Sequence, residues 1–343
     1  MKKIKLAFVG CGAITRNAHL PAGLRSPMAD VFALVDAHVD NARELGRMYG
    51  LDTIVTGDIA EVIDGADGFV LATPNDTHYP IAEQILSRGK PVLIEKPITT
   101  TYDDAVELCE LADREGTFIS VGYRYRFFPS VQFLKKLLDD NYFGRVVGFH
   151  CEMGSAGGWS PMSGYNLDRS RSGGGVLVIN GTHFLDLMLK WFGDPVRFRY
   201  EDDNFGNVEA NCKGTLTFAS DRGAFDGSFF FSKTIQLRNA FHIETEDYLV
   251  QWSPSFTDSV VAVDKQRPDV TMKLSPTEPT DSSTDYFQVQ LEEFCKNVTE
   301  RGPLTSDGRN AARSVRLINQ MYHGSTRLAE DWLAYKDRTS SVA

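Results

Sequence analysis

Cysteines are few in this chain, and their spacing matches no structural or metal-binding motif. The five residues are odd in number and widely separated, at Cys11, Cys109, Cys151, Cys212 and Cys295. They form no C-x-x-C pair, no zinc spacing and no disulfide framework. We therefore expect reduced, buried thiols, a cytoplasmic protein and no metal site.

Long hydrophobic runs and an excess of positive charge are also missing. No stretch approaches the roughly 18 apolar residues of a membrane span, and the N-terminal run MKKIKLAFVG lacks the features of a signal peptide. The 36 Lys and Arg residues are outnumbered by 46 Asp and Glu residues, which gives a net charge of −10. An acidic chain without a basic patch disfavours nucleic acid as a partner. We expect neither a membrane nor a nucleic acid to be bound.

The chain has ordinary globular composition and a length that favours two domains. It has 343 residues, of which 42% are hydrophobic and 24% are charged. Residues 1–122 alternate short apolar runs with helical periodicity, a pattern typical of βαβ units and a parallel sheet. Predicted strands cover residues 6–9, 31–35, 53–56, 68–72, 91–94 and 118–121, and predicted helices cover residues 39–49, 77–88 and 101–115. We therefore expect an α/β fold that begins with a doubly wound Rossmann domain over residues 1–122.

After residue 122 the pattern changes to α+β. Alternating residues over 197–273 predict a large, mostly antiparallel, open sheet. Other predicted elements are a strand at 145–153, a Gly/Ser-rich loop at 154–175, a linker at 275–283, and helices at 129–140, 176–192, 285–297 and 308–328. We expect a second domain over residues 123–343, for substrate binding and oligomerisation, whose C-terminal helices can pack back on the first domain.

A glycine-rich loop directly follows the first predicted strand. Gly10 and Gly12, with Ala13 and Ile14 after them, resemble the turn that lets backbone approach a pyrophosphate at a helix N-terminus. Asp36, at the end of the second strand, is placed to bind both ribose hydroxyls and to repel a 2′-phosphate. We therefore predict NAD in preference to NADP. A simple glycine turn and a helix-capping aspartate are the structural alternatives.

Two further strand ends carry polar residues. Thr73, Pro74, Asn75 and His78 follow the fourth strand and are predicted to line the cofactor crevice, although they also suit a capped helix start. Glu95 and Lys96 follow the fifth strand and precede a proline. An ammonium at this edge can bind a substrate oxygen and stabilise a developing alkoxide.

These motifs in this order resemble the Gfo/Idh/MocA oxidoreductases, relatives of glucose–fructose oxidoreductase and inositol dehydrogenase. The resemblance covers essentially the whole chain, and its most specific part is E-K-P at residues 95–97. It implies hydride transfer between NAD(P) and a sugar or cyclitol carbinol, with Lys96 polarising the reacting oxygen. It also implies a homodimer or homotetramer built through the sheet of the second domain.

One position departs from the family pattern. The helix introduced by G-G-G at 173–175 carries the family histidine at His183 and the trailing aspartate at Asp186, but the family's catalytic aspartate falls on Ile179. Isoleucine cannot exchange a proton, so we predict that His183 alone is the acid/base, with Asn180 one turn away on the same helix face. Asp168, Tyr165 and Glu152 are open alternatives for the missing polar group.

The predicted substrate is a sugar-like small molecule that can carry negative charge. The predicted contacts are Lys96, Arg124, Trp159, Tyr165, Asp168, Arg169, Asn180 and His183. Arginines suit a carboxylate or phosphate, although structural salt bridges are the alternative. We predict an NAD-dependent sugar or cyclitol dehydrogenase. Two alternatives stay open: a redox-neutral epimerase or eliminating glycosidase with tightly bound NAD, and a non-catalytic dinucleotide sensor.

Overall fold

The computed structural model describes residues 3–157, 164–204, 206–220, 223–276 and 284–329. It contains two compact units. The first unit combines Met1–Phe128 with Thr280–Arg316, and the second combines Pro129–Pro279 with Leu317–Ala343. Both units are therefore assembled from segments that are far apart in the sequence.

The first unit is built on a parallel six-stranded sheet with strand order β3-β2-β1-β4-β5-β6. Its strands are β1 (Ile4–Val9), β2 (Ala29–Val35), β3 (Ile54–Thr56), β4 (Gly68–Leu71), β5 (Val92–Ile94) and β6 (Ile119–Val121). Its helices are α1 (Leu20–Arg25), α2 (Val39–Tyr49), α3 (His78–Leu86), α4 (Tyr102–Arg114) and α8 (Tyr286–Glu300). Shorter turns are η1 (Thr15–His19), η2 (Ile59–Glu61), η3 (Asn75–Thr77) and η4 (Arg124–Phe127). This strand order is that of a Rossmann fold, which confirms the predicted fold class.

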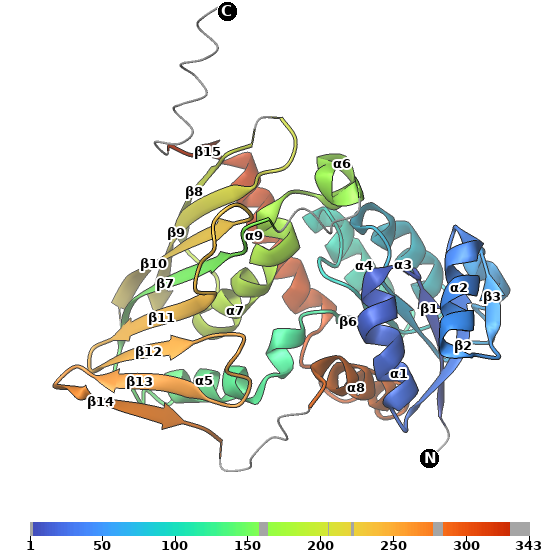
Figure 1. The fold of residues 1–343 in the computed structure, drawn as a ribbon, viewed down its shortest axis with the longest axis horizontal. Helices are drawn as coiled ribbons and strands as arrows, with labels where there is room; N and C mark the ends of the chain where they lie inside the picture. The colour runs from blue at the N-terminus through green and yellow to red at the C-terminus, as the bar shows by residue number, and fades with distance from the viewer. Residues whose placement is uncertain (1–2, 158–163, 205, 221–222, 277–283, 330–343) are drawn as a thin grey trace, which may run out of the picture. The chain divides into compact units, whose positions relative to one another are not determined.

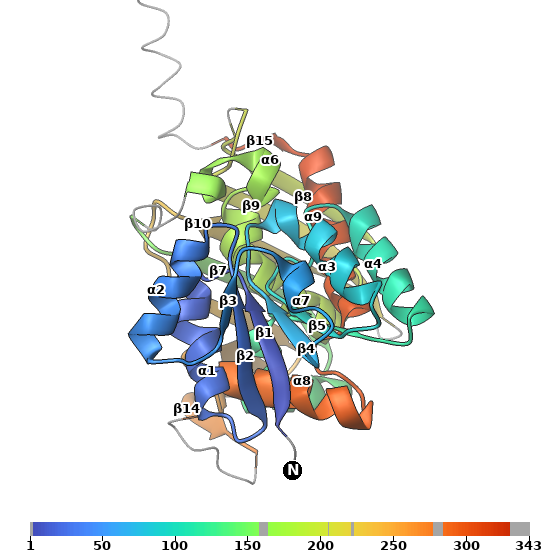
Figure 2. The ribbon, with the colours of Figure 1, turned by 90° about the vertical axis from the view of Figure 1, so that its right-hand side faces the viewer.

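Helices cover both faces of this sheet, because its strands are apolar on both sides. Figure 2 shows α1 and α2 on one side of the sheet and α3 and α4 on the other. The core on the α1 side includes Leu6, Phe8 and Val70 from the strands and Leu291 and Phe294 from α8. Part of the α8 segment therefore completes a core that starts at the beginning of the chain.

The second unit is built on a mixed nine-stranded sheet with order β14-β13-β12-β11-β7-β10-β9-β8-β15. Its strands are β7 (Val146–Gly154), β8 (Arg197–Asp202), β9 (Asn211–Ser220), β10 (Gly223–Ser232), β11 (Ala240–Thr245), β12 (Tyr248–Trp252), β13 (Val260–Asp264), β14 (Arg267–Leu274) and β15 (Thr326–Arg327). Its helical segments are α5 (Pro129–Asp139), η5 (Gly164–Leu167), α6 (Arg169–Ser172), η6 (Leu177–Gly181) and α7 (Thr182–Phe192). Most pairings are antiparallel, as predicted, but β7 pairs with β10 in parallel.

Aromatic side chains join this sheet to its helices. Figure 1 shows α5 and α7 along one side of the sheet. On that side, Trp191 of α7 packs edge-on against Phe241 and Trp252, with ring centroids 4.9 and 5.6 Å apart. The indole N–H groups of Trp191 and Trp252 donate to Val131 O and Ser130 Oγ at the start of α5. The two helices are thereby fixed to the middle of the sheet.

Two predicted boundaries were wrong. Helix α9 (Gly308–His323) ends five residues before the predicted limit at residue 328. Gly324 follows it, and the chain then pairs with β8, where Leu328 N donates to Asp202 O. The predicted loop over residues 154–175 contains the short helical turns η5 and α6, because Asp168 caps α6 by accepting the Ser170 N–H at 2.9 Å.

Candidate functional site

The glycine loop lies where β1 and β4 run side by side. Gly10 has a φ of +91°, and a Cβ atom placed on it would lie 2.4 Å from the carbonyl oxygen of Ala72. Gly12 is exposed, and a Cβ atom placed on it would meet nothing within 4 Å. Ala13 and Ile14 are also exposed at the start of the helical segment. This open, backbone-lined loop fits the pyrophosphate of a dinucleotide.

Asp36 is half-buried beside that loop. Its carboxylate accepts the backbone N–H of Cys11 at 2.8 Å and that of His38 at 2.9 Å. The side chain of Asn41 also donates to it, at 3.2 Å. Asp36 therefore ties the glycine loop to the end of β2, which is where an adenine ribose would be recognised in a dinucleotide-binding fold.

The loop after β4 is held to the loop after β5 by His78. Its imidazole is fully buried, with ring nitrogens 2.9 Å from Pro97 O and 3.0 Å from Thr73 O. Burial lowers the pKa of His78, which favours the neutral ring. Asn75 is buried in the same loop, and Thr73 and Pro74 are half-buried. The structure thus gives His78 a bridging position between two strand ends.

Glu95 is a buried carboxylate with two donors. One oxygen accepts from His19 Nε2 at 2.7 Å, and the other accepts the backbone N–H of Lys96 at 3.1 Å. Burial by itself would raise the pKa of Glu95, but the His19 hydrogen bond and the Lys96 ammonium hold that pKa below its ordinary value. Our sequence analysis missed His19, which lies in η1 and contacts Glu95 across 76 positions of sequence.

Lys96 and Arg124 are neighbouring cations at the carboxyl ends of β5 and β6. Burial lowers the pKa of Lys96 and Arg124 adds to this effect, while Glu95 opposes it. The Arg124 guanidinium lies 5.3 Å from the ring of Tyr125 and 5.2 Å from that of Phe287. Within the described part of the chain it makes no side-chain hydrogen bond or ion pair. It is therefore a preoriented cation with unused donors.

The second unit contains the predicted acid/base. His183 and Asn180 are half-buried on the continuous helical segment made by η6 and α7. Asn180 lies inside η6, a π-helical turn, which is a feature often found at functional sites. Its amide oxygen is buried and has no hydrogen-bond partner among the described residues. Lys96 belongs to the first unit and His183 to the second.

Of the residues considered as replacements at position 179, Tyr165 and Asp168 are neighbours, because Asp168 N donates to Tyr165 O at 3.2 Å. Glu152 is on β7, 3.8 Å from Arg238 Nε and 4.0 Å from His150 Nε2. Asp168 caps α6, and hydrogen bonds from Ser170 lower its pKa. Tyr165 is half-buried in η5, while Trp159 falls outside the described residues.

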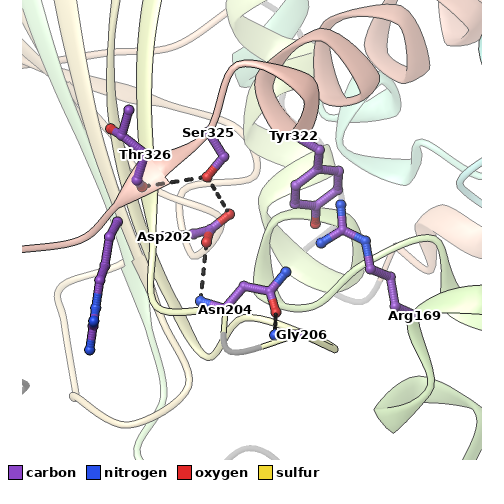
Figure 3. Close-up of a pocket in the computed structure, with 8 residues that line it drawn as sticks. Arg169, Asp202, Asn204, Gly206, Tyr322, Ser325 and Thr326 are labelled. Atoms are coloured by element: carbon purple, nitrogen blue, oxygen red, sulfur yellow. Dashed lines mark hydrogen bonds between the residues drawn. The ribbon is translucent and has the colours of Figure 1, made fainter.

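Arg169 lines a polar pocket of about 350 Å³ at one edge of the nine-stranded sheet. Its guanidinium lies 4.3 Å from the ring centre of Tyr322. Figure 3 shows these two side chains next to each other. Other lining residues are Asp202, Asn204, Gly206, Ser325, Thr326 and Arg327. Asp202 is already engaged, because it accepts from Ser325 Oγ at 2.9 Å and Asn204 N at 3.1 Å.

Two further properties concern only the part of the chain that the structure describes. Within it, no group of three or more His, Cys, Asp or Glu side chains is arranged to hold a metal ion. No helix in these described ranges combines the length and apolar character needed to cross a bilayer.

Comparison with known proteins gives relatives over part of the chain. It is 31% identical to the rhizopine catabolism protein MocA of Rhizobium meliloti, over 58% of this chain and 61% of that protein. It is 28% identical to glucose-6-phosphate 3-dehydrogenase of Bacillus subtilis, over 55% of this chain and 53% of that protein. The matched regions therefore span little more than half the length of these curated relatives.

A solved structure shares the whole fold. Levoglucosan dehydrogenase in complex with NADH and levoglucosan superposes with a TM-score of 0.83 at 18% identity, covering 94% of this chain and 97% of that one. Residues 4–123 match the family model described as an oxidoreductase family with an NAD-binding Rossmann fold, and residues 131–245 match the GFO/IDH/MocA C-terminal domain. The chain therefore belongs to the Gfo/Idh/MocA oxidoreductases, and its first unit carries the NAD-binding Rossmann fold of that family.

Proposed function

We propose that this protein is an NAD-dependent dehydrogenase that acts on a carbinol or carbonyl group of a sugar, sugar derivative or cyclitol. The observation that carries the proposal is Lys96, an ammonium at the carboxyl end of β5 whose backbone and charge are both engaged by buried Glu95. The names of the relatives support it, since they include glucose-6-phosphate 3-dehydrogenase and inositol 2-dehydrogenase.

The cofactor would be held by the glycine loop and by Asp36, with Thr73, Pro74 and Asn75 along the crevice. NAD, when bound, supplies a nicotinamide that accepts or returns a hydride. In the proposed reaction the Lys96 ammonium donates a hydrogen bond to the substrate oxygen and stabilises alkoxide character. The His183 imidazole accepts the hydroxyl proton during oxidation and returns it during reduction. Asn180 offers its amide oxygen to a neighbouring substrate hydroxyl.

A negatively charged substrate fits the cations near Lys96. Arg124 is stacked on aromatic rings and has donors available, which suits a carboxylate or phosphate. We expect Arg124→Gln to raise KM for a phosphorylated or carboxylated sugar roughly tenfold or more, which is the loss of binding free energy expected when a charged hydrogen bond is removed. KM for the matching neutral sugar stays the same. Equal effects on both substrates would contradict this assignment.

The direct test measures NADH absorbance for the purified protein with a panel of sugars, sugar acids, sugar phosphates and cyclitols. Wild type is expected to form NADH with at least one of them. Lys96→Ala is expected to abolish turnover while NAD affinity persists, because the substrate oxygen loses its stabilising cation. Lys136→Ala, which removes an exposed lysine of α5, serves as the matched control. Unchanged turnover in Lys96→Ala would remove Lys96 from the mechanism.

A redox-neutral reaction is the second candidate, and Ile179, in place of the family's catalytic aspartate, is the residue that keeps it open. A carboxylate normally shares the acid/base work in this family, and isoleucine cannot do so. Product detected by mass spectrometry without NADH accumulation would select an epimerase or eliminating glycosidase. Dinucleotide binding without any product would select a sensor.

We also infer a homodimer or homotetramer through the sheet of the second unit. Exposed polar residues such as His150 and Asp226 alternate with buried ones on β7 and β10. Size-exclusion chromatography with light scattering tests this inference, and a monomer at micromolar concentration would overturn it.

A further inference from the structure

Glu209 is a fully buried carboxylate outside the set of residues used above. It lies in the second unit, between β8 and β9. Its Oε1 atom accepts the Leu177 N–H at 2.9 Å and the Tyr322 hydroxyl at 2.8 Å. Its Oε2 atom accepts the Gly175 N–H at 2.9 Å. All three bonds come from donors that are themselves wholly or largely buried.

These bonds hold the start of the helical segment that carries Asn180 and His183. The carbonyl oxygen of Glu209 also accepts the Val176 N–H at 2.9 Å, so three consecutive backbone donors end on this one residue. The first N–H groups of a helix have no partner within the helix and must be satisfied from outside. A negative charge at this end is also favoured by the helix dipole. Glu209 therefore fixes where the segment begins.

Gly174 and Gly175, which precede the segment, lie very close to Tyr322 and Glu209. A Cβ atom on Gly174 would lie 2.0 Å from the Tyr322 hydroxyl, and one on Gly175 would lie 2.0 Å from the Glu209 carbonyl oxygen. The G-G-G sequence thus lets the chain pass close enough for these hydrogen bonds to form. The geometry would be lost with any larger residue at either position.

The described residues around this carboxylate supply it with hydrogen bonds. The Arg169 guanidinium lies over the ring of the Tyr322 donor, 4.3 Å from the ring centre. Burial raises the pKa of Glu209 to about 7, while the N–H groups of Leu177 and Gly175 and the Tyr322 hydroxyl oppose the rise. Two other titratable groups, Tyr200 and Cys212, interact electrostatically with Glu209, and Asp202 acts in turn on both of them.

We infer that Glu209, held by the Tyr322 hydroxyl, is a positioning residue that sets the place of Asn180 and His183. It contacts neither substrate nor cofactor in this assignment and acts only through the helical segment. The inference rests on the proposed function for its effect on catalysis. The hydrogen bonds that Glu209 accepts from Gly175, Leu177 and Tyr322, together called the clamp, can be tested without any turnover.

The first measurement is hydrogen–deuterium exchange in peptides covering residues 175–183. Tyr322→Phe removes one donor from Glu209 and is expected to speed this exchange roughly tenfold, in line with a lost hydrogen bond to a charged group. Tyr200→Phe is the matched control. The Tyr200 ring centre lies 5.8 Å from that of Tyr322. The substitution removes a buried hydroxyl that does not donate to Glu209, so it should leave the exchange unchanged. Equal exchange in wild type and Tyr322→Phe would overturn the clamp.

The second measurement is the pH profile of kcat with any substrate that wild type turns over. The ionised carboxylate is the stronger acceptor, so losing the Tyr322 donor should move the acid limb of the profile upward by roughly one pH unit. At neutral pH kcat should fall roughly tenfold or more, the cost of a slightly misplaced group, while NAD affinity is retained. A uniform fall in kcat with an unmoved profile would show a merely structural role.

Glu209→Gln keeps the shape of the side chain and serves if Tyr322→Phe does not fold. It should remove one titrating group from the acid limb and speed exchange over residues 175–183. If wild type turns over no substrate, the proposed function fails while the exchange result still decides the clamp. If wild type is active and the exchange and the profile of both variants match wild type, the inference fails and the proposed function stands.

Discussion

The pair formed by His19 and Glu95 shows how a single buried contact can support the chemistry of a neighbour. His19 is 1% exposed, and its ring also packs edge-on against Phe287 with centroids 5.2 Å apart. It holds the Glu95 carboxylate, whose other oxygen accepts the N–H of Lys96. The orientation of the Lys96 backbone therefore depends on a histidine that is remote in sequence.

Removing that histidine is expected to destabilise the first unit. In His19→Ala the carboxylate keeps its burial but loses its side-chain donor, at a cost of about 1–3 kcal/mol in the free energy of unfolding at pH 7. Because the folded pKa of Glu95 lies below its ordinary value, the stability it contributes is present above pH 4.5 and is lost as pH falls. Urea unfolding followed by circular dichroism at pH 7 and pH 4 measures both effects.

The conservative variant separates the hydrogen bond from packing. Glutamine at this position can still donate an N–H toward Glu95, so His19→Gln should recover part of the stability and of the turnover. Equal losses in the alanine and glutamine variants would show that ring packing against Phe287 is the main contribution.

At the scale of elements, the two glycines of the loop after β1 have different tasks. A side chain on Gly10 would collide with the carbonyl of Ala72, whereas one on Gly12 would point into open space. We therefore expect Gly10→Ala to lower the melting temperature markedly, and Gly12→Ala to leave it nearly unchanged while weakening NAD binding roughly tenfold or more. Thermal unfolding and NAD titration of the two variants test this. A large loss of stability in Gly12→Ala would contradict the open space that the structure shows.

Prediction from the sequence worked best for the strands, the helices and the motifs at strand ends. The alternation of apolar strands and helices, the glycine loop and the strand-end motif at Glu95 and Lys96 are local signals, and they predicted the Rossmann fold and the family correctly. The π-helical turns η1 and η6 were not predicted, because the apolar periodicity of such a short turn differs little from that of an α-helix. Strand β15 was missed since two residues carry no periodic signal.

At the scale of the whole molecule, the contacts that complete each site join distant parts of the chain. His19 reaches Glu95, and Tyr322 reaches Glu209 across 113 positions. No local pattern marks these partners, because each looks like an ordinary core or helix residue until the fold brings it to a carboxylate. Sequence reasoning therefore found the residues at strand ends and missed those that hold them.

The buried Glu209 also predicts how stability of the second unit varies with pH. Its folded pKa of about 7 lies above the ordinary value of 4.5. Its protonation stabilises the folded state most fully below pH 4.5, and this contribution declines as pH rises to about 7. Between pH 5 and pH 8, the unfolding free energy of wild type should therefore fall by about 3 kcal/mol more than that of Glu209→Gln.

Tryptophan fluorescence follows this transition selectively. The two tryptophans among the described residues, Trp191 and Trp252, are buried in the second unit. Parallel pH dependence in the two proteins would show that Glu209 has an ordinary affinity for protons.

The discontinuous make-up of the first unit has a consequence for biosynthesis. The ribosome releases residues 1–128 long before it has translated α8, yet Leu291 and Phe294 of that helix belong to the core formed with β1 and β4. One side of the nascent parallel sheet must stay partly uncovered while more than a hundred and fifty further residues are made. The nucleotide-binding half thus matures late, and a chaperone that shields apolar surface would find its target there during elongation.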